Sequence, residues 1–407
     1  MNKEKIGIPK LRFPGFTGAW EQRKLGDYLS IPTKEPITNI NELKLMTLKL
    51  NLEGITLTAN RETLKLGATK YYKRHEGQLL YGKQNFFHGS IALIPKEAEG
   101  YATSGDVPAL NISNINNKYL VDYISRPIYF EAKEALATGT GSKRIHEKTL
   151  FNFKIAVPSS EEQSEISNFI AKYTNLIALH QRKLEHLKQQ KNGLLQKMFP
   201  KSGESVPEVR FPGFTDSWEQ RRLGEVADSV EYGINAPAKE YDGINKYLRI
   251  TDIDDTTHEF LQSDLTSPDT DLTLAEKFKL LEGDILFART GASVGKSYIY
   301  SREDGSVYYA GFLIRMRFNK SISPNFIFQN TLTTAYKQYV EVTSQRSGQP
   351  GVNAKEYSNY SLYIPSKEEQ QKIGSFFQQL DTLIALYQRK LEHLELLKKG
   401  LLQQMFV

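Results

Sequence analysis

The chain contains two copies of the same pattern, and this repeat limits what it can fold into. Residues 176–187, LIALHQRKLEHL, recur with one change as LIALYQRKLEHL at 383–394. They lie within a longer repeat of 39 positions, 23 of them identical, that covers Glu161–Phe199 and Glu368–Phe406. A short repeat precedes each long one: LRFPGFTGAWEQRKLGD at Leu11–Asp27 and VRFPGFTDSWEQRRLGE at Val209–Glu225 share 12 of 17 residues. Two tandem copies of one architecture are therefore predicted.

The long repeats have the pattern of long helices. Ser159 with Glu162, and Ser366 with Glu369, match the capping box that begins a helix. Apolar positions then recur at intervals of four and three, which is the spacing of a coiled-coil seam. The seam positions are Ile166, Ile170, Tyr173, Ile177, His180, Leu184, Leu187, Lys191, Leu194 and Met198 in the first copy, and Ile373, Phe377, Leu380, Ile384, Tyr387, Leu391, Leu394, Lys398, Leu401 and Met405 in the second.

A narrow seam flanked by Lys, Gln, Arg and Glu needs a partner helix, and the matching copy can provide it. A pseudo-two-fold relation between the copies would make the pair antiparallel. The alternative is two ordinary core helices, one in each domain. A Lys at a seam position, as at Lys191 and Lys398, is more often a partly solvated stem than a site.

The segments between the repeats read as strands and turns with short helices, so the predicted fold class is α+β. The strand-like runs are Gln78–Tyr81, Ser90–Ile94, Asp284–Ala288, Lys296–Tyr300 and Phe312–Phe318. We expect a first mixed domain over 1–158, a helix over 159–200, a linker over 201–208, a second mixed domain over 209–365 and a second helix over 366–407. Trp20 and Trp218, in the short repeats, are expected to be packing anchors.

Composition narrows the class of protein. The chain has no Cys, no apolar run long enough to span a membrane and no apolar core of a signal peptide near its start, which favours a cytoplasmic location. Its net charge of +6 is unevenly distributed: residues 11–158 hold 20 Lys and Arg against 14 Asp and Glu, and residues 209–365 hold 17 against 21. A nucleic-acid surface in the second segment would have to be a local patch.

Motifs for catalysis are missing. GASVGKSY at Gly291–Tyr298 resembles a phosphate-binding loop but has only three residues between its glycines, so a hairpin is the better interpretation. Asp252, Asp254 and Asp255 could hold a metal, but an exposed acidic turn fits better. There is no S-adenosylmethionine glycine loop, no adenine-methylation motif of the N-P-P-Y kind, and no metal-binding spacing of His. The chain is expected to bind a ligand and to leave the chemistry to other proteins.

Two divergent domains on a fixed spacer suit a split, asymmetric DNA target, because identical domains would read a palindrome. Two other function classes stay open. A scaffold that gathers proteins would show no salt-dependent affinity for DNA. An enzyme with a cryptic nucleotide loop would bind ATP through Lys296.

Over essentially its whole length, the chain resembles the specificity subunit of type I restriction–modification systems. The resemblance rests on the tandem RFPGF…WEQR segments, on the paired P-S-x-E-E-Q…LIAL-x-QRKLE-x-L helices and on GDILFARTGASVGK. It implies two target-recognition domains, two antiparallel helices, and assembly with two methyltransferase and two restriction subunits. S-adenosylmethionine, ATP and Mg²⁺ would belong to those partners and none to this chain, and adenine would be methylated at N6 in each half-site.

The candidate contact residues come from two sources. Polar and basic side chains on the turns after the central strands and in two Gly-rich loops are expected to contact DNA. In the first domain they are Lys83, Gln84, Asn85, Ser142, Lys143 and Arg144, and in the second they are Tyr232, Asn235, Arg289, Thr290, Lys296, Arg346, Ser347 and Gln349. Off-seam residues that are identical in both helices are expected to bind partner subunits: Gln181, Arg182, Lys183, Glu185, Gln388, Arg389, Lys390 and Glu392. No metal site is expected.

Overall fold

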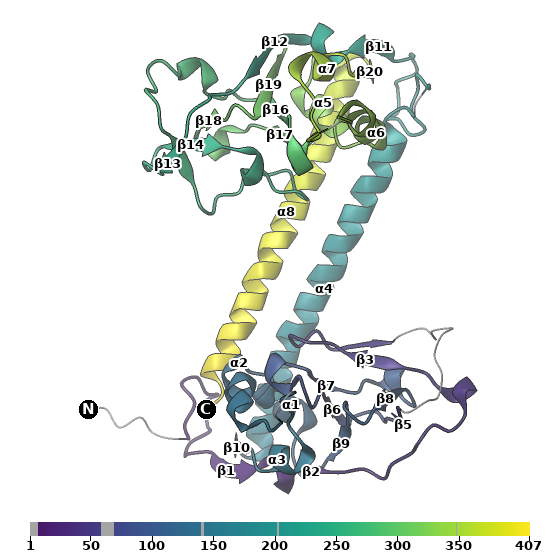
Figure 1. Ribbon diagram of the computed structural model, residues 1–407, viewed down its shortest axis with the longest axis vertical. Helices are drawn as coiled ribbons and strands as arrows, with labels where there is room; N and C mark the ends of the chain where they lie inside the picture. Colours follow the sequence, from purple (N-terminus) through teal and green to yellow (C-terminus); the bar gives the residue numbers. More distant parts are fainter. Residues whose placement is uncertain (1–6, 58–68, 140–141, 202, 347) are drawn as a thin grey trace. The chain divides into compact units, whose positions relative to one another are not determined.

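The computed structural model describes residues 7–57, 69–139, 142–201, 203–346 and 348–407. The chain divides into two compact units (Figure 1), unit 1 with Met1–Leu179 and Leu391–Val407, and unit 2 with His180–Lys390. Two long helices, α4 (Ser160–Met198, 39 residues) and α8 (Lys367–Gln404, 38 residues), each contribute to both units. At 1.5 Å per residue, each helix is about 58 Å long. Within the described ranges, no helix is both long and apolar enough to cross a membrane.

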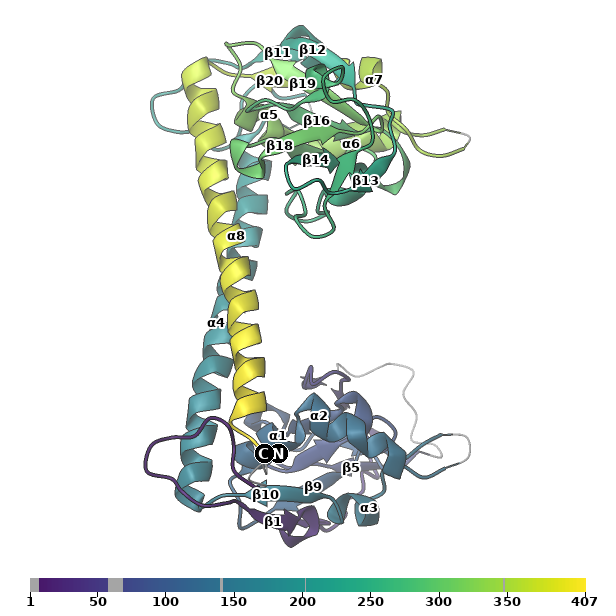
Figure 2. The same ribbon diagram turned by 90° about the vertical axis from the view of Figure 1, so that its left-hand side faces the viewer.

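The two helices are antiparallel, as the cores of both units show. In unit 1, Ile166 and Ile170 near the start of α4 share a core with Met405 and Phe406 at the end of α8. In unit 2, Leu195 near the end of α4 shares a core with Ile373 near the start of α8. Both views show the helices lying side by side in each unit (Figures 1 and 2). The fold predicted from the repeats is therefore confirmed.

Each unit contains a four-stranded antiparallel sheet with the same topology. In unit 1 the order is β2-β9-β6-β7, and in unit 2 it is β12-β19-β16-β17. The strands of unit 1 are β2 (Leu29–Ser30), β9 (Ala109–Ile112), β6 (Leu79–Tyr81) and β7 (Ile91–Leu93). Those of unit 2 are β12 (Ala227–Tyr232), β19 (Leu313–Phe318), β16 (Ile285–Ala288) and β17 (Ser297–Ile299). Each of the five strand-like runs in the sequence contains one of these strands.

A two-stranded ribbon joins each short repeat to the segment that enters the long helix. β1 (Glu21–Lys24) pairs with β10 (Lys154–Val157), and β11 (Glu219–Arg222) pairs with β20 (Ser361–Ile364), both antiparallel. The short helices are α1 (Asn117–Ile124), α2 (Pro127–Phe130) and α3 (Glu147–Phe151) in unit 1, and α5 (Pro324–Asn330), α6 (Thr334–Thr343) and α7 (Ala354–Ser358) in unit 2. The two domains thus repeat their framework as well as their sheet.

The domains diverge on the far side of the sheet from the long helices. We call the mixed domain of unit 1 domain 1 and that of unit 2 domain 2. In domain 1 the smaller ribbons are β3 (Met46–Leu48) with β4 (Ile55–Leu57) and β5 (Tyr71–Lys73) with β8 (Ala102–Ser104). In domain 2 they are β13 (Ala238–Glu240) with β15 (Thr266–Pro268), and the parallel pair β14 (Asn245–Leu248) with β18 (Ser306–Tyr309). These lobes have small cores of their own, such as the one around Leu80 and Ile94 and the one around Leu286 and Tyr309. The variable segments therefore keep the sheet and change what surrounds it.

The short repeat fastens the start of one long helix to the end of the other. The Arg12 guanidinium makes two hydrogen bonds of 2.7 Å to the Glu162 carboxylate at the start of α4. The Leu11 amide donates to the Gln404 carbonyl at the end of α8, 2.9 Å away. In unit 2, Arg210 binds Glu369 at 2.8 and 2.7 Å, and the Val209 amide donates to the Lys197 carbonyl at 2.8 Å.

This arrangement corrects half of the predicted capping box. The hydroxyls of Ser159 and Ser366 accept hydrogen bonds from the amides of Glu162 and Glu369, as expected. Both glutamate carboxylates, however, bind the arginine of the short repeat instead of reaching back to the cap amide. They are 1% exposed, and a buried carboxylate is favoured beside a bidentate guanidinium. The repeated Glu-Glu-Gln sequence therefore marks a junction between repeats.

The two tryptophans are buried packing anchors, as predicted. Trp20 packs edge-on to Phe406 with ring centroids 6.3 Å apart, and Trp218 packs edge-on to Phe199 at 6.2 Å. Each aromatic pair joins a short repeat to the end of a long helix within one unit.

Candidate nucleic-acid interface

The candidate contact residues lie in equivalent loops of the two domains. The Lys83 amide donates to the Asp106 carbonyl at 2.9 Å, and in domain 2 the Arg289 amide donates to the Phe312 carbonyl at 3.1 Å. The carbonyls of Lys83 and Arg289 then accept from the amides of Ile145 and Val352, at 2.7 and 2.9 Å. These bonds make Lys83 equivalent to Arg289, and Asp106 equivalent to Phe312.

We call these groups of loops loop cluster 1, residues 82–85, 105–107 and 142–145, and loop cluster 2, residues 288–291, 310–312 and 349–352. Each cluster brings together three segments that are far apart in the sequence. The predicted residues Lys83, Gln84, Asn85, Ser142, Lys143 and Arg144 fall in the first, and Arg289, Thr290 and Gln349 fall in the second. The structure thus brings all six predicted residues of domain 1 together in one cluster, but only three of the eight predicted residues of domain 2.

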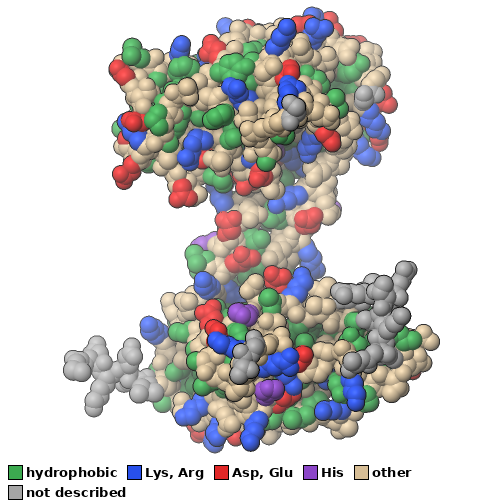
Figure 3. All heavy atoms as spheres, in the orientation of Figure 1, with side chains coloured by type: hydrophobic (Ala, Val, Ile, Leu, Met, Phe, Trp, Pro, Cys, Tyr) green, Lys and Arg blue, Asp and Glu red, His purple; other side chains and the backbone are tan. Residues whose placement is uncertain are grey.

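Each of the three candidate cations of loop cluster 1 is paired with a carboxylate. The Lys83 ammonium lies 2.8 Å from Glu147 and the Lys143 ammonium 2.7 Å from Glu134. The Arg144 guanidinium lies 3.1 Å from Asp106. Consistent with such pairing, Lys and Arg side chains are interspersed with Asp and Glu on the face of the units drawn in Figure 3. This cluster presents a mixed-charge, hydrogen-bonding surface.

The two amides of loop cluster 1 differ in their roles. With its amide oxygen turned toward Arg144, Gln84 accepts a hydrogen bond of 2.7 Å from the guanidinium and one of 3.3 Å from the Ser142 hydroxyl. Asn85 accepts main-chain hydrogen bonds from His88 and Ser90, each 3.0 Å long, and so forms the turn after β6. Gln84 therefore links Arg144 and Ser142 within the cluster, and Asn85 shapes the loop.

Loop cluster 2 is built around Arg289. Its guanidinium lies over the Tyr232 ring, 5.0 Å from the centroid, and its Nη1 donates to the Gly311 carbonyl at 3.5 Å. No carboxylate of the described residues forms an ion pair with it, in contrast to the cations of loop cluster 1. A guanidinium stacked on an aromatic ring keeps donors for a phosphate or a base.

Thr290, Gln349 and Asn235 accompany Arg289. Thr290 pairs with Gly351 through a β-bridge, and this places the late Gly-rich loop beside the turn after β16. The side-chain amide of Gln349 lies so close to Gly291 that a Cβ there would be 3.0 Å from it. Asn235 is exposed just beyond β12. These side chains can donate and accept hydrogen bonds, as the reading of base edges requires.

Lys296 has a structural role in this molecule. It lies in the hairpin between β16 and β17, which confirms the hairpin interpretation of GASVGKSY. Its ammonium donates to the Ile253 carbonyl at 2.9 Å and pairs with Asp255, and its side chain is 10% exposed. Gly295, at φ +85°, lies against α6, where a Cβ would be 2.5 Å from Val340. The glycines of this loop therefore allow close packing.

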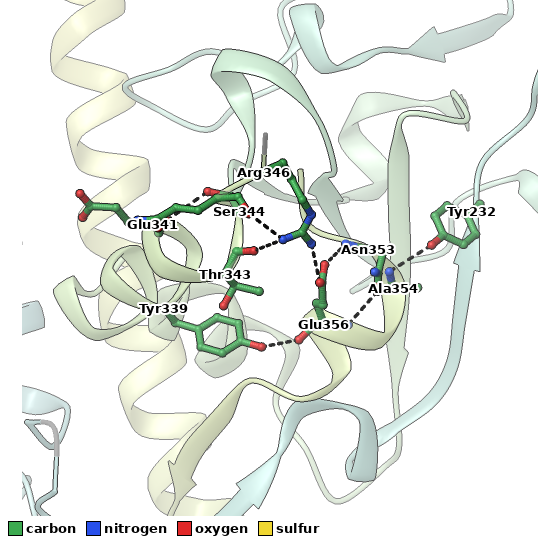
Figure 4. A network of polar contacts seen from close by, with 10 residues as sticks. Tyr232, Tyr339, Glu341, Thr343, Ser344, Arg346, Asn353, Ala354 and Glu356 are labelled. Carbon is green, nitrogen blue, oxygen red and sulfur yellow. Dashed lines mark hydrogen bonds and ion pairs between the residues drawn. The ribbon is translucent and has the colours of Figure 1, made fainter. Parts of the chain in front are cut away.

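Arg346 supports the loop that carries Gln349 (Figure 4). Its guanidinium donates to the carbonyls of Thr343 and Gln345 at 2.8 and 3.0 Å, and it pairs with Glu356. The Glu356 carboxylate also accepts from the Asn353 amide at 2.8 Å, at the start of α7. Ser347, the neighbouring candidate, lies outside the described residues.

Tyr232 is tied to the same network. Its hydroxyl accepts a hydrogen bond of 3.1 Å from the amide of Ala354 (Figure 4). This bond holds the ring that supports Arg289 against the first turn of α7. Tyr232 therefore connects the loop network to the guanidinium of loop cluster 2.

The acidic turn Asp252–Asp255 is held by the protein itself. Asp252 pairs with Arg249 at 2.8 Å. Asp254 accepts from the amides of Thr257 and Thr256 at 2.7 and 2.8 Å, and these bonds lower its pKa. Across the described residues, no group of three or more His, Cys, Asp or Glu is placed to hold a metal ion.

The candidate partner surface lies on the two long helices. Gln181, Arg182, Lys183 and Glu185 are exposed on α4, and Arg389, Lys390 and Glu392 are exposed on α8, with Gln388 half-buried. Burial raises the pKa of Glu259, and the nearby charge of Arg389 opposes this effect. The Glu185 carboxylate accepts a hydrogen bond of 2.8 Å from the side-chain amide of Gln189 on the same helix.

Sequence reasoning missed Asp106 and Phe312, which occupy equivalent places in the two clusters. Phe312 was assigned to the strand that begins one residue later, β19. Asp106 follows Gly105, a turn signal, but nothing in the local pattern joins it to Lys83. An alignment by fold, with the central strands matched, would have found both.

Known proteins are similar to this chain over both of its repeats. The family model of the type I restriction modification DNA specificity domain matches twice, at residues 18–189 and 215–396. The MjaVIII type I restriction enzyme specificity subunit of Methanocaldococcus jannaschii is 22% identical over 404 residues, covering 94% of this chain and 91% of that protein. The HindI specificity subunit of Haemophilus influenzae is 25% identical over 196 residues, covering 47% of this chain and 41% of its own length.

Solved structures share the fold. The S subunit of a type I restriction–modification system from M. genitalium has a TM-score of 0.61 at 16% identity, covering 98% of this chain and 99% of its own. A chain from a study of complex assembly and conformational transition of the type I R-M system has a TM-score of 0.50, also at 16% identity, with 98% and 99% covered. At these identities the similarity concerns the fold.

Proposed function

Because this chain belongs to the type I restriction–modification DNA specificity family, we propose that it recognises an asymmetric, bipartite DNA target and directs partner subunits to it. Domain 1 would contact one half-site through loop cluster 1, and domain 2 the other through loop cluster 2. The partners would then methylate adenine at N6 or cleave the DNA. The chain itself would be the non-catalytic, cytoplasmic reader of this complex.

One observation carries the proposal of an asymmetric target. The two clusters have the same backbone hydrogen bonds but different side chains, with Lys83 and Asp106 in one and Arg289 and Phe312 in the other. Equal frameworks with unequal side chains suit two half-sites of different sequence, since base edges differ in donors, acceptors and methyl groups. The repeated helices would act as the spacer between the two half-sites.

Cofactors of the reaction would be bound by the partners. S-adenosylmethionine for methylation, and ATP and Mg²⁺ for restriction, are assigned to the methyltransferase and restriction subunits. In this chain, the lysine of the GASVGKSY loop already has partners within the protein: Lys296 binds the Ile253 carbonyl and the Asp255 carboxylate. A nucleotide at that loop would have to displace these contacts.

The proposed partners are two methyltransferase and two restriction subunits. Each long helix carries the sequence Gln-Arg-Lys-Leu-Glu, and its Arg, Lys and Glu side chains are exposed on both helices, so the same partner surface could be bound twice. Exposed arginine is a suitable anchor, because its planar guanidinium makes bidentate hydrogen bonds to carboxylates.

The test of the DNA function is a modified-base methylome of cells with and without this gene, with the methyltransferase partner present in both. N6-methyladenine that depends on the gene, on a split asymmetric motif with one fixed gap, is expected. If no motif appears while the same methyltransferase is active with another specificity chain, the DNA-reader proposal fails and a protein scaffold takes its place.

The partner surface is tested by reversing the charge of Arg182 and Arg389 together and measuring co-purification with the methyltransferase. The double variant is expected to bind markedly less. Lys188→Glu is the matched control, because the other helix has Glu395 at that position and the charge is not repeated. Undiminished binding by the double variant would remove the claim that this surface docks the partner.

A further inference from the structure

Phe312 is an exposed aromatic residue at the centre of loop cluster 2. Phe312 is 59% exposed and Tyr232 is 41% exposed. Over the described ranges, these are the two aromatic side chains among the exposed large hydrophobic residues. Arg289 lies beside both, with its guanidinium over the Tyr232 ring and its amide bonded to the Phe312 carbonyl.

The backbone that carries Phe312 is held from several sides. The amide of the preceding Gly311 donates to the Ile234 carbonyl at 2.7 Å, and the amide of the following Leu313 donates to the Ala310 carbonyl at 2.9 Å. The turn also lies against Gly233, where a Cβ would be 2.3 Å from the Ala310 carbonyl. A single exposed apolar residue is ordinary on a protein surface. Phe312, however, lies on a turn that is fixed by hydrogen bonds and is surrounded by candidate base-reading groups. Its position relative to a bound ligand is therefore defined.

We propose that Phe312 contacts the C5 methyl group of a thymine in the half-site read by domain 2. The inference rests on the proposed DNA function and adds the chemistry of one position. A phenyl side chain offers no conventional hydrogen bond, so it can distinguish base edges only by an apolar group. In the major groove, the thymine methyl is the apolar group that the base pairs present. Thr290, Gln349 and Arg289 supply the polar contacts around it.

Domain 1 has the opposite chemistry at the equivalent place. The Asp106 carboxylate, 3.1 Å from Arg144, accepts hydrogen bonds and is repelled by other acceptors. It favours the amino group of cytosine or adenine over the O4 of thymine. The two domains therefore prefer different bases at the position where their loops correspond, and this difference makes the target asymmetric.

The experiment selects DNA from a randomised pool with the chain assembled with its methyltransferase partner. The unmodified complex, Phe312→Ala and Asp106→Ala are compared. We expect Phe312→Ala to lose thymine enrichment, by about fourfold, at one position of one half-site, since one buried methyl-sized group contributes about that factor. Asp106→Ala should change the other half-site and so identify the half read by domain 1.

Replacing that thymine by uracil then removes only the methyl group. The unmodified complex should bind the uracil DNA about fourfold more weakly. The Phe312→Ala complex should bind both DNAs equally, and Phe312→Leu should retain part of the preference. Val342→Ala, at an exposed apolar residue of α6 outside the cluster, is the control and should keep the original preference.

Five outcomes overturn the inference. If Phe312→Ala leaves the motif unchanged, Phe312 does not recognise thymine. The same conclusion follows if Phe312→Ala changes the half-site that Asp106→Ala also changes, because that half-site is read by domain 1. If uracil has no effect but Phe312→Ala weakens binding to every base, the ring is a wedge between base steps. If Phe312→Ala no longer binds the methyltransferase, the ring is a protein contact. No motif for the unmodified complex would overturn the proposed function as well.

Discussion

Arg12 and Arg210 are the residues that connect the repeats within each unit. Both make bidentate hydrogen bonds to a buried glutamate, and their Nη1 atoms also donate to a carbonyl of their own loop, Gly18 at 2.6 Å and Asp216 at 2.9 Å. The bonds to Glu369 raise the pKa of Arg210. Removing one partner would leave a carboxylate with 1% exposure and no counter-ion.

Arg210→Met should therefore destabilise unit 2 by about 3–5 kcal/mol, the usual cost of leaving a buried charge unpaired. The double variant Arg210→Met with Glu369→Leu should recover most of that loss, because both charges are then gone. Urea denaturation followed by far-UV circular dichroism measures both values.

Arg221→Met is the control for this pair. Arg221 pairs with Glu219, but both side chains are about half exposed or more, so the expected loss is about 0–1 kcal/mol. Equal losses for Arg210→Met and Arg221→Met would show that the buried junction is not special.

Asp122, on α1, is a carboxyl group in a poorly solvated place. Burial raises its pKa to about 7, and the nearby charge of Lys398 opposes the shift. The folded state therefore holds this proton more tightly than the unfolded chain, in which the pKa is about 3.9. Its contribution to stability is complete below about pH 4 and is lost as the pH rises through 7.

Asp122→Asn should remove this dependence. The variant should match the original protein near pH 4 and be more stable at pH 8 by about 1–3 kcal/mol, discounted for partial exposure. Thermal denaturation across this pH range tests it, with the exposed Asp228→Asn as control. A variant that loses stability at pH 8 would mean that the charged carboxylate is the favoured form beside Lys398.

At the scale of elements, the two long helices use the same seam position differently. The Lys191 ammonium lies 2.5 Å from Asp381 on α8, and Asp381 also accepts from Gln329 of α5 at 2.8 Å. In unit 1, Lys398 has the carboxyl group of Asp122 on α1 nearby. Each seam lysine thus has an acidic neighbour. The neighbour of Lys191 lies on the other long helix, and the neighbour of Lys398 lies on α1 of domain 1.

Three helical glycines test how closely the elements pack. At Gly193 in α4 and Gly400 in α8, an added Cβ would meet no atom within 4 Å outside the helix. At Gly374 in α8 it would lie 3.0 Å from the Cβ of Asn325 and from the Phe326 amide nitrogen. The start of α5 therefore approaches α8 where there is room only for glycine.

Gly193→Ala and Gly400→Ala should each stabilise the protein by about 0.4–1 kcal/mol, because alanine loses less backbone entropy in a helix. Gly374→Ala, in α8 like Gly400→Ala, should instead destabilise the protein by about 1–3 kcal/mol through overpacking. Denaturant midpoints give the sign directly. A stabilising Gly374→Ala would contradict the close packing of α5 on α8.

At the scale of the whole molecule, the charge of the two domains differs. Residues 11–158 have six more cations than anions, whereas residues 209–365 have four fewer. Loop cluster 1 pairs its cations with carboxylates, and loop cluster 2 has Arg289 stacked on Tyr232. Because domain 1 has the excess of positive charge, non-specific attraction to DNA should come mainly from this domain and should weaken as the salt concentration rises.

Lys143→Gln with Arg144→Gln should reduce the slope of log affinity against log salt by up to about 2, and Arg289→Gln should reduce it by about 1. The measurement is a titration of the assembled complex with DNA lacking the motif, at several salt concentrations. Arg221→Gln, outside both clusters, should leave the slope unchanged. Unaltered slopes for all three variants would place the phosphate contacts elsewhere.

The sequence by itself determined the architecture: two related α+β domains, two long helices and their antiparallel pairing. Helical periodicity and capping are local, and a tandem repeat carries its own symmetry, so both can be read without coordinates. The central strands and the Gly-rich hairpin were also predictable, since apolar runs bounded by turn residues identify them. The same loops provided most of the candidate DNA contacts.

Only the tertiary structure decided which charges are paired and which groups meet in the loop clusters. Arg12 and Glu162 are 150 positions apart, and Arg144 and Asp106 are 38 apart. The correspondence of Asp106 with Phe312 depends on backbone hydrogen bonds between segments whose sequences no longer match. Local patterns report which face of an element is buried, but the partner of a side chain is set by how distant elements pack, and that information exists only in the folded chain.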